Sequence, residues 1–292
     1  MFNAATIWQV VVNGASLSAI YVLVALGFTL LFGIMRVVNF AHGAFAMLGG
    51  YALYYFWGRF GVPYVIAVPL AAAFVALVAL IAEGLVFRWF YQRMFESMIA
   101  LLGLNLALVY SAVMIWDVSE RSIPPAFSGL IEVGGLLLPK DRLMVICIAV
   151  VVLVSFWVFM TRTRQGLAMR ATAQDLEIAE TQGINTSVTY RIAFLIAIFM
   201  TALAGALYAQ IYSLSPFMGD RPLMVAFVVV ILGGMGSIPG AALGGVILGF
   251  TESFLATFYG ASVSSFVSFG VVIALLIVRP WGLLGTPDGA RA

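Results

Sequence analysis

Charge is scarce in this sequence. Charged residues make up 9% of the 292 positions and hydrophobic residues 64%, whereas soluble domains carry about 25% and about 45–50% respectively. This imbalance excludes an ordinary water-soluble domain. The formal net charge is only +2 and the basic residues are scattered among apolar runs, so we expect no nucleic-acid partner.

The residue types used by common enzyme and metal sites are also nearly missing. The single histidine excludes a two-histidine H-E-x-x-H zinc site, and the only lysine, Lys140, follows a Leu-Leu-Leu-Pro run instead of a P-loop glycine. There is no Gly-x-Ser-x-Gly turn, and the lone Cys147 excludes an intrachain disulfide. We therefore expect no catalysis, no metal and no cofactor.

Long apolar runs are abundant. A bilayer core of about 30 Å needs about 20 apolar residues per helix, and the runs predict an all-α, polytopic transmembrane bundle of eight or nine spans in one domain, residues 1–292. The short segment Leu223–Leu232 ends in a glycine-rich stretch, which predicts a broken or re-entrant helix near residues 223–240. The expected spans are Trp8–Phe32, Val37–Trp57, Pro63–Phe87, Met94–Trp116, Leu143–Thr161, Tyr190–Leu214, Leu223–Leu232, Ala241–Phe258 and Ser264–Val278.

Two polar loops orient these spans. Residues 117–142 contain a Pro-Pro pair and mixed charges, and residues 162–189 open with Arg162, Arg164 and Arg170. The positive-inside rule places the second loop in the cytoplasm and the first outside. Counted from there, nine of the fourteen basic residues lie inside, with the N-terminus outside and the C-terminus inside if there are nine spans.

Polar residues in the apolar runs are candidates for a substrate path. Asn39, His42 and Gly43 open the second span, either as a helix cap with a histidine bonded to a neighbouring carbonyl or as path-lining groups. Gly233, Gly234, Gly236 and Ser237 form the break, either as packing glycines or as a path-lining hinge. Glu252 lies deep in its span and is the candidate functional carboxylate.

The cytoplasmic loop predicts a docking element. Residues Leu167–Gln182 favour a helix, bounded by Gly166 and Gly183, that has no lipid to face. Its mixed charges and its exposed apolar Leu176 and Ile178 indicate a cytoplasmic partner, against the alternative of a solvated connector.

An internal repeat is a further hypothesis. An offset of 200 residues pairs Leu23 with Leu223 and Gly33 with Gly233, although a chain so rich in Ala, Leu and Gly produces such matches by chance. Many transporters are built from two related halves.

Four motifs together resemble a known family. The runs Gly27–Ile34 with Asn39–Gly43, Gly166–Asp175 with Gly183–Asn185, Gly233–Gly240, and Arg279–Leu283 are similar to those of the first permease subunit of branched-chain amino acid ABC importers. The resemblance extends from about Gly14 to Leu284.

The resemblance implies a multi-pass permease of the bacterial plasma (inner) membrane, embedded in lipid. Its implied partners are a second homologous permease, two cytoplasmic ATPases and an extracytoplasmic solute-binding protein. The ATPase-coupling residues would be Gly166, Arg170, Ala171, Asp175, Glu177, Glu180 and Gly183.

One position departs from the family pattern. Relatives commonly carry an acid after His-Gly, where this chain has Ala44, and the family also includes importers of urea, amides and aromatic acids. These solutes stay open beside branched-chain or other hydrophobic amino acids. An ion-coupled secondary transporter or channel, with Glu252 and the broken helix as its coupling site, is the alternative of a different class.

Overall fold

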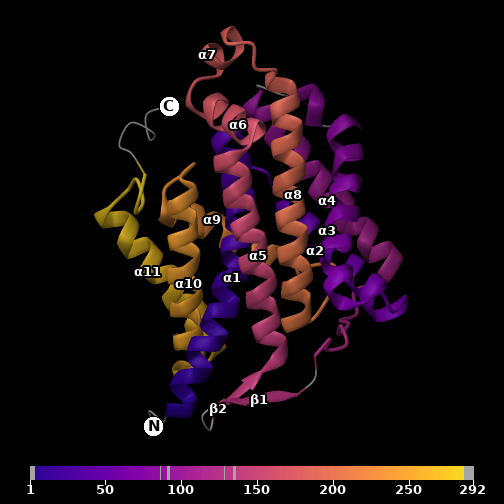
Figure 1. The fold of residues 1–292 in the computed structure, drawn as a ribbon, viewed down its shortest axis with the longest axis vertical. Helices are drawn as coiled ribbons and strands as arrows, with labels where there is room; N and C mark the ends of the chain where they lie inside the picture. Colours follow the sequence, from indigo (N-terminus) through magenta and orange to yellow (C-terminus); the bar gives the residue numbers. More distant parts are fainter. Residues whose placement is uncertain (1–3, 86, 91–92, 128, 134–135, 286–292) are drawn as a thin grey trace.

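The computed structural model describes residues 4–85, 87–90, 93–127, 129–133 and 136–285 as a bundle of helices (Figure 1). A short antiparallel hairpin pairs Leu130 with Pro139 and Val133 with Leu136. The helices and strands are α1 (Ala4–Met35), α2 (His42–Leu53), η1 (Tyr54–Arg59), α3 (Tyr64–Leu85), η2 (Phe87–Phe90), α4 (Met94–Trp116), β1 (Leu130–Val133), β2 (Leu136–Pro139), α5 (Lys140–Arg162), α6 (Arg164–Gln174), α7 (Leu176–Thr181), α8 (Thr186–Ile211), α9 (Asp220–Gly233), α10 (Ile238–Tyr259) and α11 (Ala261–Val278).

Seven helices in the described part of the chain are long and apolar enough to cross a membrane: α1, α3, α4, α5, α8, α10 and α11. The other two expected spans correspond to shorter helices. One is α2, which η1 continues as a π-helical turn, and the other is α9, whose 14 residues extend only about 21 Å. The chain thus combines full-length helices with two half-length ones.

Both short helices begin inside the bundle. His42, the first residue of α2, contacts Val24 of α1, which lies 11 residues before the end of that helix, about 16 Å along its axis. The start of α9 meets the start of α2, because a Cβ on Gly219 would collide with the carbonyl of Gly43. Two helix N-termini therefore meet at the buried pair Gly43 and Gly219, while Asp220 and Arg221, the first residues of α9, are exposed.

The two halves of the chain repeat one arrangement in opposite directions. In the first half α1 is followed by the half-helix α2 and then by α3 and α4; in the second, α8 is followed by the half-helix α9 and then by α10 and α11. Helix α1 packs on α9 and α10, and α8 packs on α2 and α3. In Figure 1, α1 rises from the N-terminal end whereas α8 descends.

This arrangement corrects the expected offset of 200 residues. Asp220 lies 178 positions after His42, and Ile211 lies 176 after Met35, so the chance matches in small residues misled the alignment. The repeat is of the inverted-topology kind found in many transporters.

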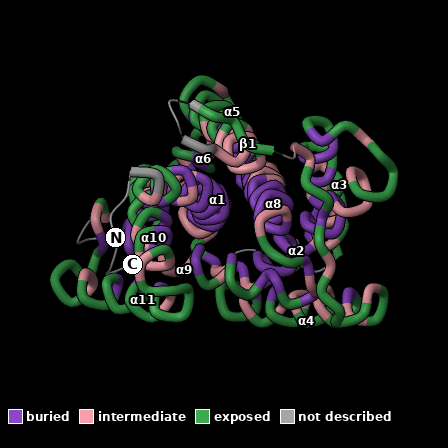
Figure 2. Tube along the Cα trace, turned by 90° about the horizontal axis from the view of Figure 1, so that it is seen from below, coloured by how far each residue is buried: buried purple, intermediate pink, exposed green. Residues whose placement is uncertain are grey.

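The centre of the bundle is formed by α1 and α8. In the most apolar 18-residue stretch of each helix, 89% of α1 and 78% of α8 is buried in protein. The corresponding share is 17% for α4 and for α11. Figure 2 shows the buried α1, α2 and α8 surrounded by helices with exposed outer faces. Those faces carry large apolar side chains such as Leu77, Ile99 and Phe266, as lipid or a protein partner in the membrane requires.

Glycines permit a close helix contact between α2 and α8. A Cβ on Gly49 would collide with the backbone of Ala202, and one on Gly205 with the backbone of Ala46. Small residues allow two backbones to approach in this way when no hydrophobic driving force acts between helices in lipid.

The polar segments lie at opposite ends of the bundle. The hairpin lies at the end of the bundle where α1 begins, and α6 and α7 lie at the other end (Figure 1). The prediction of a single helix over Leu167–Gln182 was wrong. The helix is interrupted at Asp175, whose side chain accepts a hydrogen bond from the backbone N–H of Ile178 at 2.9 Å and so starts α7.

Candidate functional site

A charged cluster joins a buried carboxylate to an arginine whose side chain is 43% exposed. Glu252 of α10 is 6% exposed, forms an ion pair with Arg221 of α9 and accepts a hydrogen bond from the Tyr21 hydroxyl of α1 at 2.5 Å. Ionised side chains inside a membrane protein are costly and usually face a partner or a water-filled cavity. The Glu252 carboxylate has two partners, Arg221 and Tyr21, and Glu252 lines two cavities.

Arg221 and Glu252 are positioned by the glycines that begin α9 and α11. Arg221 is in the first turn of α9, directly after the Gly219 contact that anchors the start of this helix. Between α10 and α11 the chain turns at Gly260, so that the Ser264 hydroxyl of α11 donates to the backbone carbonyl of Glu252 at 2.8 Å. Two helices, α1 and α9, therefore contact the carboxylate, and α11 bonds the backbone of the same residue.

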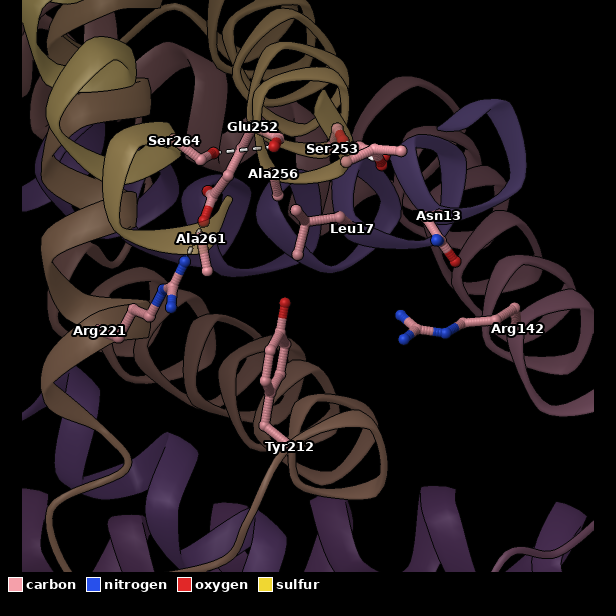
Figure 3. Close-up of a pocket in the computed structure, with 11 residues that line it drawn as sticks. Asn13, Leu17, Arg142, Tyr212, Arg221, Glu252, Ser253, Ala256, Ala261 and Ser264 are labelled. Carbon is pink, nitrogen blue, oxygen red and sulfur yellow. Dashed lines mark hydrogen bonds and ion pairs between the residues drawn. The ribbon is translucent and has the colours of Figure 1, made fainter. Parts of the chain in front are cut away.

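One cavity of about 230 Å³ lies on one side of the ion pair. Tyr212 and Arg142 point into it in Figure 3, and the Arg221 guanidinium lies 5.8 Å from the centre of the Tyr212 ring, within cation–π range. Its lining residues are Asn13, Leu17, Arg142, Tyr212, Arg221, Glu252, Ser253, Ala256, Thr257, Ala261 and Ser264.

A second cavity of about 310 Å³ lies between α9, α10 and α11. Its walls are largely apolar, with Asp220, Arg221, Glu252, Ser265 and Ser268 as the polar lining residues. The apolar lining residues are Met224, Val225, Val228, Leu248 and Phe269.

A third cavity, of about 540 Å³, separates the expected coupling segment from the core. It is bordered by the end of α1 around Arg36, by Tyr190 of α8 and by residues 172–177 of α6 and α7. Arg36 has a φ of 53°, in the left-handed region that non-glycine residues seldom adopt. The expected coupling segment, α6 and α7, thus faces the end of α1, the helix that carries Tyr21, across this cavity.

The expected coupling residues are distributed over this segment. Arg170, Asp175, Glu177 and Glu180 are exposed, and the Glu180 carboxylate accepts a hydrogen bond from Thr186 at 2.8 Å. The buried side of α6 is formed by Gly166, Met169 and Thr172. Ala171 is half-buried, and Gly183 ends the segment with a φ of 81°.

His42 and its neighbours are enclosed. The His42 ring is fully buried, with Nε2 3.0 Å from the carbonyl of Val24 and 3.0 Å from the hydroxyl of Thr201. The Asn39 side-chain oxygen accepts from the backbone N–H of Ala41 at 3.0 Å, and Gly43 packs on Gly219. None of the three cavities is lined by these residues.

The glycine-rich break is also tightly packed. Gly233 abuts Gly240, and Gly236 lies near Gly33 of α1. The carbonyls of Leu232 and Gly233, which the end of α9 leaves without helical donors, accept hydrogen bonds from Leu283 and Leu284 at 2.8 and 3.0 Å.

Gly234 and Ser237, the other two candidate residues of the break, are also packed or hydrogen-bonded. Gly234 has a φ of 104° and touches Gly285. The Ser237 hydroxyl accepts from the N–H of Gly240 at 3.1 Å and so caps α10. The break lies apart from Glu252, so the structure does not bring all the candidate path residues together.

Sequence reasoning identified Glu252 but missed its partners. Arg221 lies two residues before the expected span Leu223–Leu232, and its side chain reaches the carboxylate of Glu252. Tyr21, Tyr212 and Arg142 carried no signal because aromatic residues are frequent in the chain and Arg142 lies at a helix end. The signal available was Asp220-Arg221-Pro222 at the start of an apolar segment, which is typical of a helix N-terminus.

Comparison with known proteins identifies the family to which the chain is similar. A family model described as "Branched-chain amino acid transport system / permease component" matches residues 10–276. The chain is 30% identical to the high-affinity branched-chain amino acid transport system permease protein BraD of Pseudomonas aeruginosa, over 96% of each chain. It is also 30% identical to LivH of Escherichia coli K12, over 96% of each chain, and 29% identical to the probable LivH of Methanocaldococcus jannaschii, over 95% of this chain and 92% of the other.

Proposed function

Because the chain belongs to the branched-chain amino acid transport permease family, we propose that it forms the membrane path for branched-chain or other hydrophobic amino acids in an ABC importer. The chain is a multi-pass membrane transport subunit and not an enzyme. The observation that carries the proposal is the family match over residues 10–276. The relatives' names supply the class of solute.

The partners follow from the same proposal. A second homologous permease covers exposed apolar faces of this one, two cytoplasmic ATPases bind the end that carries α6 and α7, and a solute-binding protein delivers the amino acid at the opposite end. The exposed charges of Arg170, Asp175 and Glu177 support the second contact, since charge complementarity sets orientation at such interfaces. The binding protein selects the solute before the permease receives it.

In this mechanism α1 links the ATPases to the charged cluster. Helix α1 packs against α6 near its end and against α9 and α10 along its length, and it carries Tyr21, which binds Glu252. ATP binding that moves α6 and α7 therefore displaces a helix in direct contact with the cluster. Such coupling needs packed elements with two arrangements, and the third cavity gives α6 and α7 room to move.

Urea, amides and aromatic acids are the alternative solutes within the same family. Uptake of radiolabelled leucine, benzoate and urea should be measured in cells that express the permease with its partner proteins, and in matched cells without the ATPases. We expect leucine uptake that disappears without the ATPases. Uptake of benzoate or urea in place of leucine would show that the permease carries that solute and not leucine. Leucine uptake without the ATPases would favour the ion-coupled transporter or channel.

A further inference from the structure

The ion pair of Arg221 and Glu252 forms a partition between two cavities. These two residues are the only lining residues that the first and second cavities share. The first cavity is bordered by Arg142 and Tyr212 and the second by the apolar side chains of α9, α10 and α11. The pair therefore borders both cavities and is accessible to a solute from either one.

The chemistry of the pair matches one class of solute. A guanidinium binds a carboxylate through two parallel hydrogen bonds, and a carboxylate accepts hydrogen bonds from an ammonium group. A zwitterionic α-amino acid carries both groups on neighbouring atoms. It can therefore replace each partner of the ion pair without leaving either charge unpaired.

Other solutes of the family lack this match. An aromatic acid pairs with Arg221 and leaves Glu252 as an uncompensated buried carboxylate, which is strongly unfavourable. Urea and amides have no charge with which to separate the pair. The arrangement therefore discriminates by charge pattern, in addition to the selection made by a binding protein.

We infer that Arg221 and Glu252 bind the head group of a zwitterionic amino acid, with Arg221 receiving the carboxylate and Glu252 the ammonium group; this inference rests on the proposed function. The side chain of the amino acid enters the second cavity. Its apolar walls, formed by residues such as Val225, Leu248 and Phe269, suit a branched aliphatic group.

An unpartnered hydroxyl in the second cavity supports a ligand there. Ser268 lines this cavity, is 5% exposed, and its Oγ has no hydrogen-bond partner in the described part of the chain. Buried polar atoms nearly always have a partner.

The chain offers a matched control. Glu83 of α3 is 1% exposed and forms an ion pair with Arg191 of α8 at 3.3 Å, so it resembles Glu252 in burial and in its arginine partner. Glu83 lines none of the three cavities. A purely structural role for buried carboxylates predicts similar effects at the two positions.

The test uses the complete complex in proteoliposomes with its binding protein, and measures leucine uptake per ATP hydrolysed. For Glu252→Gln we expect this ratio to fall at least about tenfold, because a charge-assisted contact to the ammonium group is lost. Glu252→Asp should retain part of the uptake, and Glu83→Gln should keep the wild-type ratio. The double variant Arg221→Met with Glu252→Leu leaves no charge unpaired and is expected to assemble, but with the same tenfold loss.

The outcomes separate two failures. A wild-type complex that takes up leucine, with Glu252→Gln or the double variant at the wild-type ratio, would overturn the head-group site alone. An equal fall of the ratio in Glu83→Gln would also overturn it, since burial alone would then explain the effect. A wild-type complex that takes up no leucine would overturn the proposed function and this inference together.

Discussion

Replacement of His42 by alanine should destabilise the protein more than it impairs the transport step. The imidazole is fully buried at the start of α2, meets Phe28 edge-on at 5.4 Å, and contacts Val24 and Thr201 from two other helices. It therefore fills space where α1, α2 and α8 converge. His42 is the residue around which the half-helix α2 is held inside the bundle.

The magnitude follows from packing and hydrogen bonding. Truncation of a buried ring to alanine costs about 3–5 kcal/mol through transfer and cavity terms, and the hydrogen bond adds about 1 kcal/mol. The Thr201 hydroxyl keeps its bond to the Ala197 carbonyl at 2.7 Å, so it is not orphaned. An imidazole is smaller than a phenyl or indole ring, so we expect a total at the low end of this sum, about 4 kcal/mol, which is a large part of the about 5–15 kcal/mol that holds a typical protein folded.

Thermal unfolding of the purified complex in detergent measures this loss. A loss of about 4 kcal/mol corresponds to a Tm lower by roughly 10 °C for a chain of this size, with a reduced yield of assembled complex. His42→Leu preserves the volume and removes only the hydrogen bond, so its Tm should fall by about a quarter as much. An unchanged Tm and yield for His42→Ala, with uptake per complex reduced more than about tenfold, would refute the packing argument and make His42 a path residue.

Two further predictions concern the helix crossing and the coupling segment. Gly205→Ala should lower the Tm by an amount equivalent to about 2 kcal/mol or more, because its Cβ collides with the backbone of Ala46. Gly103→Ala on α4, where a Cβ meets open space, should leave the Tm unchanged or raise it. Arg170→Glu should lower leucine uptake per ATP by about fivefold or more without changing the Tm. Asp175→Asn, which keeps the capping oxygen of α7, should show whether the charge itself is needed, and wild-type coupling in both variants would contradict docking through this segment.

Most of the long apolar helices could be predicted from the sequence, because runs of apolar residues identify them directly. Seven of the nine expected spans are helices long enough to cross a membrane, and helix propensity predicted a helical polar segment between α5 and α8. The half-helices were harder to predict. The expected second span started at Val37, but residues 36–41 are not helical and α2 begins only at His42, because the start of α2 packs on Gly219, which lies far away in the sequence.

The candidate site was predictable only in part. Glu252 was found because a lone carboxylate deep in an apolar run has few harmless explanations. Its pairing with Arg221 depends on how α9 packs against α10, and counting charges by loop cannot reveal that. The break at Asp175 did have a local signal, since aspartate favours the position before a helix over the interior of one.

ATP-driven accumulation of leucine in proteoliposomes tests the central claim most directly. The vesicles should contain this permease, its partner permease and the two ATPases, with the binding protein outside and ATP supplied on the ATPase side. We predict that leucine accumulates above its external concentration with ATP, and that accumulation stops when the ATPases carry an inactivating substitution at the catalytic site. Leucine movement at the same rate with inactive ATPases, or driven by an ion gradient in their absence, would contradict the account.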